Sequence, residues 1–152
     1  RCQVESVCDV VGQIPDWDPM ALEFVADGSV RDAYPLPVVR GPAGEATLVI
    51  DWRPLVLAVL DDLARGSAAS LMAARFHQAL AVAITSVARE VGLEHVALSG
   101  GCFQNRLLTA RTIEALRTAG HQVLLHRRVP PGDGGIALGQ IATAAARLKA
   151  GL

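Results

Sequence analysis

The sequence predicts an α/β fold on two observations. From residue 47 onward, short apolar segments typical of strands alternate with longer segments of helical periodicity, in the order β-α-α-β-α-β-α. Three of the helical segments run into a glycine, at Gly66, Gly92 and Gly120, and glycine is the usual residue just past a helix C-terminus. The sequence contains no internal repeat, coiled-coil heptad or low-complexity tract that would suggest another architecture.

The composition fits one compact domain. The 152 residues are 51% hydrophobic and 19% charged, with a net charge of −1 and a mean hydropathy of +0.35. These values exclude a disordered chain and give no electrostatic reason to expect binding to nucleic acid or to an anionic membrane. No uninterrupted apolar run reaches the roughly 18 residues of a membrane span. The first residues do not show the pattern of a secretory leader, so export is not expected. The three cysteines suggest neither a disulfide framework nor a zinc pair, so we expect a cytoplasmic protein. Its start at Arg1 suggests a fragment or a processed product.

Two regions are predicted along the chain. Residues 1–46 are rich in glycine and proline and are expected to form an irregular N-terminal segment with short helices. One such helix is expected over residues 20–27, with Asp18 as its N-cap. Residues 34–46 are expected to be extended or irregular, because their prolines forbid a continuous helix or a central strand. Residues 47–152 are expected to form the α/β lobe.

The lobe is predicted to open with a strand at residues 47–51 and a helix that follows Pro54. A long helix is expected over residues 67–92, with Ser67 or Ser70 as its cap. Its buried face is predicted from apolar residues at helical spacing, which are Phe76, Leu80, Ile84, Val87 and Val91. There follow a strand from 95 into a glycine turn, a helix at 103–120, a strand at 121–127, a tight loop at 129–135 and a closing helix at 136–148.

Two glycine-rich loops follow successive predicted strands, SGG at residues 99–101 and DGG at residues 133–135. Ligands of open α/β sheets bind beyond the carboxyl ends of the strands, and Gly100 and Gly101 would let the backbone approach a phosphate or a purine closely. Neither loop matches the Walker or the dinucleotide fingerprint. On the local pattern alone, a purely structural turn is slightly favoured over a phosphate site.

Two polar residues of these loops are candidates for binding. The amide of Asn105 is suited to ribose hydroxyls or a base edge, although a local capping bond explains it equally well. Asp133 is expected to be a turn former or the N-cap of the last helix. As a hard oxygen ligand it could also hold a metal, for which other ligands would be required.

The histidines and cysteines nominate no catalytic residue. No two histidines stand four residues apart on one helix, so the helical pairing of metal-binding histidines is absent. His77 is expected to be a hydrogen-bonded interior histidine of the long helix. Cys102 stands at a helix N-terminus, where a thiol pKa can fall, but the sequence nominates no histidine to act with it, so it is interpreted as a small core residue.

The combination of LSGGCFQNRLL (98–108) with VPPGDGGIALGQ (129–140), preceded by ARFHQALA (74–81), resembles the C-terminal end of the hydrogenase maturation carbamoyltransferases, the HypF family. The resemblance covers about residues 47–150. It implies the second lobe of an actin/hexokinase/Hsp70-like (ribonuclease-H-like) fold, which this family shares with the universal tRNA threonylcarbamoyl transferases. Residues 1–46 would then be a partial remnant of the region between the lobes.

The resemblance also implies ligands and a reaction. Gly100, Gly101 and Asn105 would contact an adenine nucleotide, either ATP or carbamoyl-adenylate, and Asp133 would be one ligand of a divalent metal, iron or zinc. The family transfers a carbamoyl group from carbamoyl-adenylate to the C-terminal cysteine of its partner protein HypE. The family's H-x-x-x-H metal ligands and its adenylate-forming domain belong to upstream domains. The isolated chain is therefore expected to be inactive, with those domains of its parent chain as further partners.

Two alternatives stay open. The segment from Gln13 to Asp18 departs from the family pattern, which favours a degenerate, non-catalytic lobe that binds only a nucleotide or a protein. A fragment of a tRNA threonylcarbamoyl transferase is the other alternative. Phe103 and Gln104 favour the hydrogenase branch, because the resemblance implies two small residues at these places in the tRNA branch.

Overall fold

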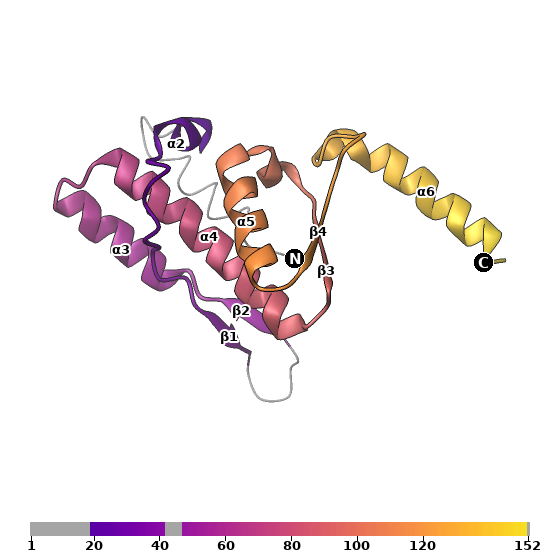
Figure 1. Ribbon diagram of the computed structural model, residues 1–152, viewed down its shortest axis with the longest axis horizontal. Coiled ribbons are helices and arrows are strands. Elements are labelled where there is room, and N and C mark those ends of the chain that lie inside the picture. Colours follow the sequence, from indigo (N-terminus) through magenta and orange to yellow (C-terminus); the bar gives the residue numbers. More distant parts are fainter. Residues whose placement is uncertain (1–18, 42–46, 152) are drawn as a thin grey trace.

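The computed structural model describes residues 19–41 and 47–151. Asp18, the expected N-cap of the first short helix, lies outside the described residues. So does the rest of the segment from Gln13 to Asp18, which departs from the family pattern. The helices and strands follow the chain in the predicted α/β order (Figure 1). They are α2 (Pro19–Val25), β1 (Val38–Arg40), β2 (Leu48–Ile50), α3 (Arg53–Ala64), α4 (Ala69–Val91), β3 (His95–Leu98), α5 (Arg106–Thr118), β4 (Gln122–Leu125) and α6 (Ile136–Lys149), with single 3-10 turns at Gly101–Gln104 and Asp133–Gly135.

The strands β1 and β2 form an antiparallel ribbon, in which Val38 pairs with Ile50 and Arg40 pairs with Leu48. The strand β1 lies within the segment that was expected to be extended or irregular. Prolines are compatible with it because a two-stranded ribbon consists only of edges, where a missing N–H is tolerated. The carbonyl of Pro37 accepts a 2.9 Å hydrogen bond from the backbone of Asp51, which closes the base of the ribbon.

The long helix α4 is the centre of the protein. Its predicted buried face is correct at Phe76 and Leu80. The prediction is wrong at Val91, which is 56% exposed, and only half right at Ile84 and Val87, which are partly buried. Elements cover α4 on more than one side, so its small residues are buried as well, among them Ala73, Ala74, Ala79, Ala81, Ala83 and Ala88.

The start of α4 also differs from the prediction. The N-cap residue is Ala68, which has no capping side chain, instead of Ser67 or Ser70. Ser67 is engaged elsewhere, because its hydroxyl donates a 3.1 Å hydrogen bond to Asp62 Oδ1. The C-terminus follows the prediction: Gly92 adopts a left-handed conformation with φ of 71°, which a residue with a side chain rarely adopts.

Helix α4 is also long and apolar enough to cross a membrane by length and composition alone, although no uninterrupted apolar run of that length was found in the sequence. Over its most apolar window, 56% of the residues are buried inside the protein. Burial of this extent is typical of a core helix, and α4 serves as one here.

In the part of the chain that the structure describes, two apolar clusters form the core. The first lies between α3, α4 and α5, and the second lies where α4 and α5 meet the parallel pair β3–β4. The first contains Tyr34, Leu55, Phe76, Ala79, Leu80 and Leu108, and the second contains Ala88, Leu98 and Leu116 with the partly buried Val96, Phe103, Ile113 and Val123.

The segment β3-α5-β4 is a β-α-β unit. The two strands are parallel, with Leu98 opposite Leu125, so both carboxyl ends lie at the same edge. The helix α5 begins at Arg106, three residues after the predicted start, because residues 101–104 form a 3-10 turn. This edge carries the glycine-rich loops.

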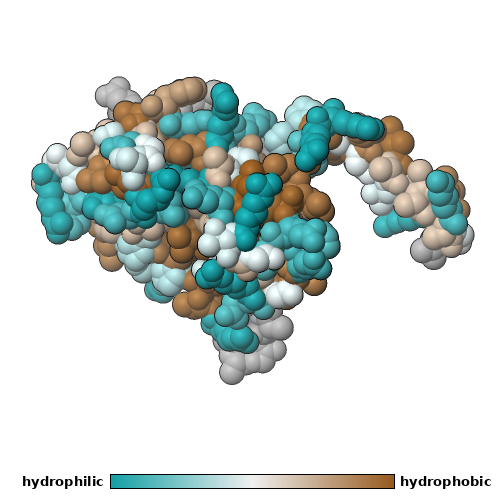
Figure 2. Space-filling view, viewed as in Figure 1, coloured by the Kyte–Doolittle hydropathy of each residue, from teal (hydrophilic) through white to brown (hydrophobic). Residues whose placement is uncertain are grey.

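The last helix, α6, projects away from the rest of the protein (Figure 1). Every side chain from 136 to 149 is exposed, and apolar surface runs along the helix (Figure 2). The exposed large apolar residues are Ile136, Leu138, Ile141 and Leu148.

Candidate functional site

The turn at residues 99–104 is shaped by Gly100. Its φ of 108° lies in the region that strongly favours glycine. The carbonyl of Gly100 accepts a 3.1 Å hydrogen bond from the backbone of Phe103, and the Phe103 ring packs against the second core cluster. The β3 strand is thereby joined to α5 through an ordered turn.

The two glycine-rich loops lie against each other. The backbone N–H of Gly100 donates a 2.7 Å hydrogen bond to the carbonyl of Pro131. At Gly132, a Cβ would lie 2.8 Å from Gln104 Nε2 and 3.5 Å from Gly101 Cα, so the absence of a side chain permits this close approach. The sequence placed both loops at neighbouring strand ends, and the structure brings them into contact.

Asn105 is the N-cap of α5. Its Oδ1 accepts a 2.8 Å hydrogen bond from the backbone of Leu108, so the local capping bond is present. Its Nδ2 lies 2.8 Å from Nε2 of His77 on α4. The Asn105 side chain is partly buried and links α5 to the central helix.

His77 is an interior histidine held by two hydrogen bonds, as predicted. It is 3% exposed, and its Nδ1 lies 2.7 Å from the carbonyl oxygen of Ala73. A carbonyl can only accept, so Nδ1 carries the hydrogen. Burial is the main cause that lowers the pKa of His77, and Arg111 acts in the same direction. The neutral ring therefore offers Nε2 as an acceptor to Asn105.

Glu23 is a residue that the sequence did not single out. From α2, its Oε1 accepts a 2.8 Å hydrogen bond from the backbone N–H of Arg106, the first residue of α5. The N-terminal end of a helix carries a partial positive charge that attracts anions, and at α5 the Glu23 carboxylate already occupies this position. No local signal predicts this contact, since the two residues are 83 positions apart.

Asp133 opens the short turn before α6 and is exposed. It is a turn residue as expected, but the N-cap of α6 is Gly135, so the prediction of Asp133 as that cap is wrong. Within residues 19–41 and 47–151, no group of three His, Cys, Asp or Glu side chains could hold a metal ion. The donors around Asp133 in this part of the chain therefore do not amount to a metal site.

Cys102 is exposed, so its interpretation as a small core residue is wrong. The 3-10 turn places the next residue, Phe103, against the core instead. At the same edge, Ser99 Oγ lies 3.1 Å from Nε2 of His126. This contact links the ends of β3 and β4, and the sequence did not predict it.

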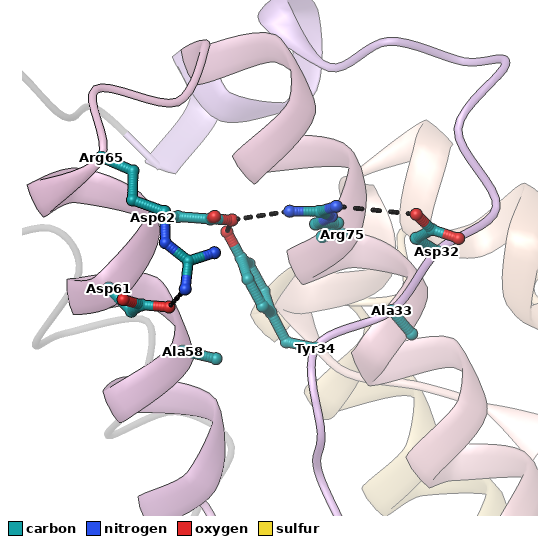
Figure 3. Close-up of a pocket in the computed structure, with 8 residues that line it drawn as sticks. All are labelled: Asp32, Ala33, Tyr34, Ala58, Asp61, Asp62, Arg65 and Arg75. Carbon is teal, nitrogen blue, oxygen red and sulfur yellow. Dashed lines mark hydrogen bonds and ion pairs between the residues drawn. The ribbon is translucent and has the colours of Figure 1, made fainter.

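A separate pocket of about 340 Å³ lies between α3, α4 and the chain at residues 32–34 (Figure 3). At its centre, Asp62 Oδ2 accepts hydrogen bonds from the Tyr34 hydroxyl at 2.7 Å and from Arg75 at 2.8 Å. The hydrogen bond from Tyr34 is the main cause that lowers the pKa of Asp62, and burial raises the pKa of Tyr34. The lining residues are Asp32, Ala33, Tyr34, Ala58, Asp61, Asp62, Arg65 and Arg75.

Each charged side chain around this pocket has a partner of opposite charge, with two arginines shared among three aspartates. Arg75 also lies 3.6 Å from Asp32, and Arg65 pairs with Asp61 on the surface of α3. The cluster therefore holds the chain at residues 32–34 against two helices. Because its charged groups are paired with one another, we interpret this pocket as part of the structure and not as a binding site.

Comparison with known proteins identifies a family. Residues 18–140 match the family model described as "Carbamoyltransferase, Kae1-like Domain, second subdomain". The carbamoyltransferase HypF of Synechocystis sp. is 45% identical over 97 residues, which cover 64% of this chain and 12% of that protein. The carbamoyltransferase HypF homolog of Cupriavidus necator is 43% identical over 139 residues, 88% of this chain and 35% of that protein. The chain thus spans only a minor part of these relatives.

Solved structures agree with the sequence matches. A full-length HypF in its phosphate- and nucleotide-bound form superposes with a TM-score of 0.71 at 30% identity, covering 89% of this chain and 18% of that chain. The HypF of T. kodakarensis gives a TM-score of 0.65 at 26% identity over the same shares. The predicted fold, an α/β lobe of the actin/hexokinase/Hsp70-like type, is confirmed.

Proposed function

The chain belongs to the HypF carbamoyltransferase family, and we propose that it is the C-terminal nucleotide-binding lobe of such an enzyme. Its ligand is an adenine nucleotide, ATP or carbamoyl-adenylate, which lies over Gly100, Gly101 and Asn105. The observation that carries the proposal is the 2.7 Å hydrogen bond from Gly100 to Pro131. It joins the two glycine-rich loops into one surface at the carboxyl ends of β3 and β4, where α/β sheets bind ligands.

The charges near this surface decide which end of the nucleotide faces α5. Glu23 already accepts from the first N–H of the helix, and a phosphate there would meet a carboxylate. Asn105 keeps one amide hydrogen and one lone pair beyond its two bonds within the protein. These suit a neutral sugar hydroxyl or base edge, so the phosphates point away from the α5 N-terminus.

The proposed parent reaction is carbamoyl transfer to the C-terminal cysteine of a HypE-like acceptor, in hydrogenase maturation in the cytoplasm. The cysteine sulfur bonds to the carbamoyl carbon and releases its proton, while the bond from that carbon to the adenylate oxygen breaks and AMP leaves. The lobe contributes binding and orientation of the nucleotide. Asp133 would supply one ligand to an iron or zinc ion whose other ligands come from upstream domains of the parent chain. The isolated chain is accordingly inactive in transfer.

Nucleotide binding is tested by titrating the ¹⁵N-labelled chain with millimolar ATP and following the backbone amides by NMR. We expect shifts concentrated at Gly100, Gly101 and Asn105, and a clearly weaker affinity in Asn105→Ala. Thr118→Ala, at the exposed far end of the same helix, is the matched control and should respond as the wild type does. An absence of shifts in the wild type, or an affinity that is unchanged in Asn105→Ala, would rule out this site.

The inactivity of the isolated chain is tested separately. The chain is incubated with carbamoyl-adenylate and a HypE-like acceptor, and the acceptor cysteine is analysed by mass spectrometry. No modification above the enzyme-free control is expected, and robust turnover would overturn the claim.

A second candidate is a non-catalytic lobe that binds a partner protein. It is favoured by α6, which exposes Ile136, Leu138 and Ile141 along one projecting helix. A lobe of the tRNA-modifying branch is less favoured. Phe103 packs against the second core cluster, and Gln104 fills the space over Gly132. Two small residues in their place would leave both positions unfilled.

A further inference from the structure

We propose that His77 is a positioning residue for the nucleotide site, and that its Nδ1–H tautomer fixes the orientation of the Asn105 amide. This inference rests on the proposed function, in which Asn105 contacts the nucleotide. His77 itself is buried on α4 and acts only through Asn105.

A directed chain of hydrogen bonds connects the two helices. The Ala73 carbonyl accepts from Nδ1 of His77 at 2.7 Å, which leaves Nε2 without a hydrogen in the neutral ring. That nitrogen accepts from Asn105 Nδ2 at 2.8 Å. The Asn105 Oδ1 then accepts from the backbone of Leu108 at 2.8 Å. Each acceptor determines the direction of the next bond.

The reverse orientation of the amide is excluded by the same contacts. A flipped Asn105 would place its NH₂ group against the Leu108 N–H and its oxygen against the lone pair of His77 Nε2. Both hydrogen bonds would be lost. A donor would then face a donor at Leu108 and an acceptor would face an acceptor at His77, in a partly buried place. The ring of His77 thus determines which amide hydrogen and which lone pair remain for a ligand.

Charged groups from two neighbouring elements also face the imidazole. Arg111 on α5 opposes its protonation, and Glu23 on α2 favours it, while burial holds the ring in the neutral form. An imidazolium would carry a hydrogen on Nε2 and could no longer accept from Asn105. The positioning function therefore requires the neutral ring.

The positioning is tested first without a nucleotide. Long-range ¹H–¹⁵N NMR correlations of the wild-type chain should show a protonated Nδ1 and an unprotonated Nε2 at His77 at neutral pH. An Nε2–H tautomer or an imidazolium would overturn the proposal, whatever the nucleotide does.

The second test measures ATP affinity by NMR titration in His77→Gln and His77→Phe. The Gln oxygen can stand close to Nε2 and accept from Asn105, so its affinity should stay near that of the wild type. Phe keeps an apolar ring of similar size but offers no acceptor, and its affinity should fall about tenfold, the equivalent of one lost hydrogen bond. Backbone amide spectra of both variants establish that the lobe is folded, and equal affinities would overturn the proposal.

A double variant separates positioning from a general structural role. If His77 acts through Asn105, His77→Phe combined with Asn105→Ala should bind ATP as Asn105→Ala alone does. Additive losses would mean that His77 supports the lobe in another way and would overturn the proposal. If Asn105→Ala binds ATP as the wild type does, the proposed function fails instead, and the tautomer measurement still decides how the amide is held.

Discussion

The hydroxyl of Tyr34 donates a 2.7 Å hydrogen bond to Oδ2 of Asp62, and the pair joins segments that lie 28 positions apart in the sequence. Asp62 is 6% exposed and also accepts from Arg75 and from the hydroxyl of Ser67. A buried carboxylate is tolerated only when such donors replace its water. Tyr34 belongs to the first core cluster, so its ring packs in the core while its hydroxyl serves this carboxylate.

The first prediction concerns this pair. Tyr34→Phe removes one donor from Asp62 and leaves the ring packing intact, so the free energy of unfolding should fall by about 1–2 kcal/mol. The measurement is equilibrium denaturation in urea. Asp61→Ala, which breaks the exposed pair with Arg65, is the control and should change stability by less than about 1 kcal/mol. Equal effects of the two variants would show that the hydroxyl contributes nothing specific.

The second prediction concerns pH. Because burial lowers the pKa of His77 from its ordinary value of 6.5, the unfolded chain binds a proton at His77 more readily than the folded chain does. Stability should therefore be highest above pH 6.5 and should fall as the pH drops from 6.5 toward the folded pKa. Urea denaturation across this range tests the expectation. In His77→Gln this part of the slope should disappear, and an unchanged slope would assign it to another group.

The elements of the lobe could be predicted because their signals are local. The glycine at position 92 ends α4 through a left-handed backbone, and the alternation of apolar segments fixed the order of strands and helices. The buried face of α4 was predicted only in part, because a periodicity argument assumes that a helix buries one stripe. A helix that is covered on several sides buries alanines as well. The alanines at 73, 74 and 81 do not follow the spacing of a single stripe, so periodicity could not predict their burial.

The site could be predicted only where its residues are close in sequence. The SGG and DGG loops were expected at neighbouring strand ends, and the hydrogen bond between Gly100 and Pro131 follows from that placement. The contact of Glu23 with Arg106 depends on how α2 packs against α5, which no short pattern encodes. For the same reason the bond between Asn105 and His77 was not foreseen, although each residue was considered by itself.

The third prediction concerns the loop before α6. A Cβ at Gly135 would lie 2.9 Å from the backbone carbonyl oxygen of Pro130, so Gly135→Ala must shift the backbone of the loop. We expect a local cost of roughly 1–2 kcal/mol, seen as faster amide hydrogen exchange over residues 129–135. At Gly139, inside α6, a Cβ meets nothing within 4 Å. Gly139→Ala should slow exchange in α6, since alanine favours helix by about 1 kcal/mol over glycine, and similar exchange in both variants would contradict the steric argument.

The fourth prediction concerns Arg111, a buried guanidinium that ties α5 to two other parts of the chain. It is 5% exposed, and it donates to the carbonyl oxygens of Ala74 at 2.7 Å and of Val30 at 3.0 Å. Arg111→Ala removes these charge-assisted bonds and opens a cavity.

The loss of Arg111 should therefore cost about 3 kcal/mol or more of unfolding free energy. Arg111→Lys should recover only part of it, because one ammonium cannot reproduce the fork of donors that a guanidinium offers to separate carbonyls. Urea denaturation provides the measurement, with Arg117→Ala on the exposed face of the same helix as the matched control. If Arg111→Ala were as stable as the control, residues 27–30 would have to be held by other contacts, such as the 3.1 Å hydrogen bond from the Asp27 backbone to the Ser70 carbonyl of α4.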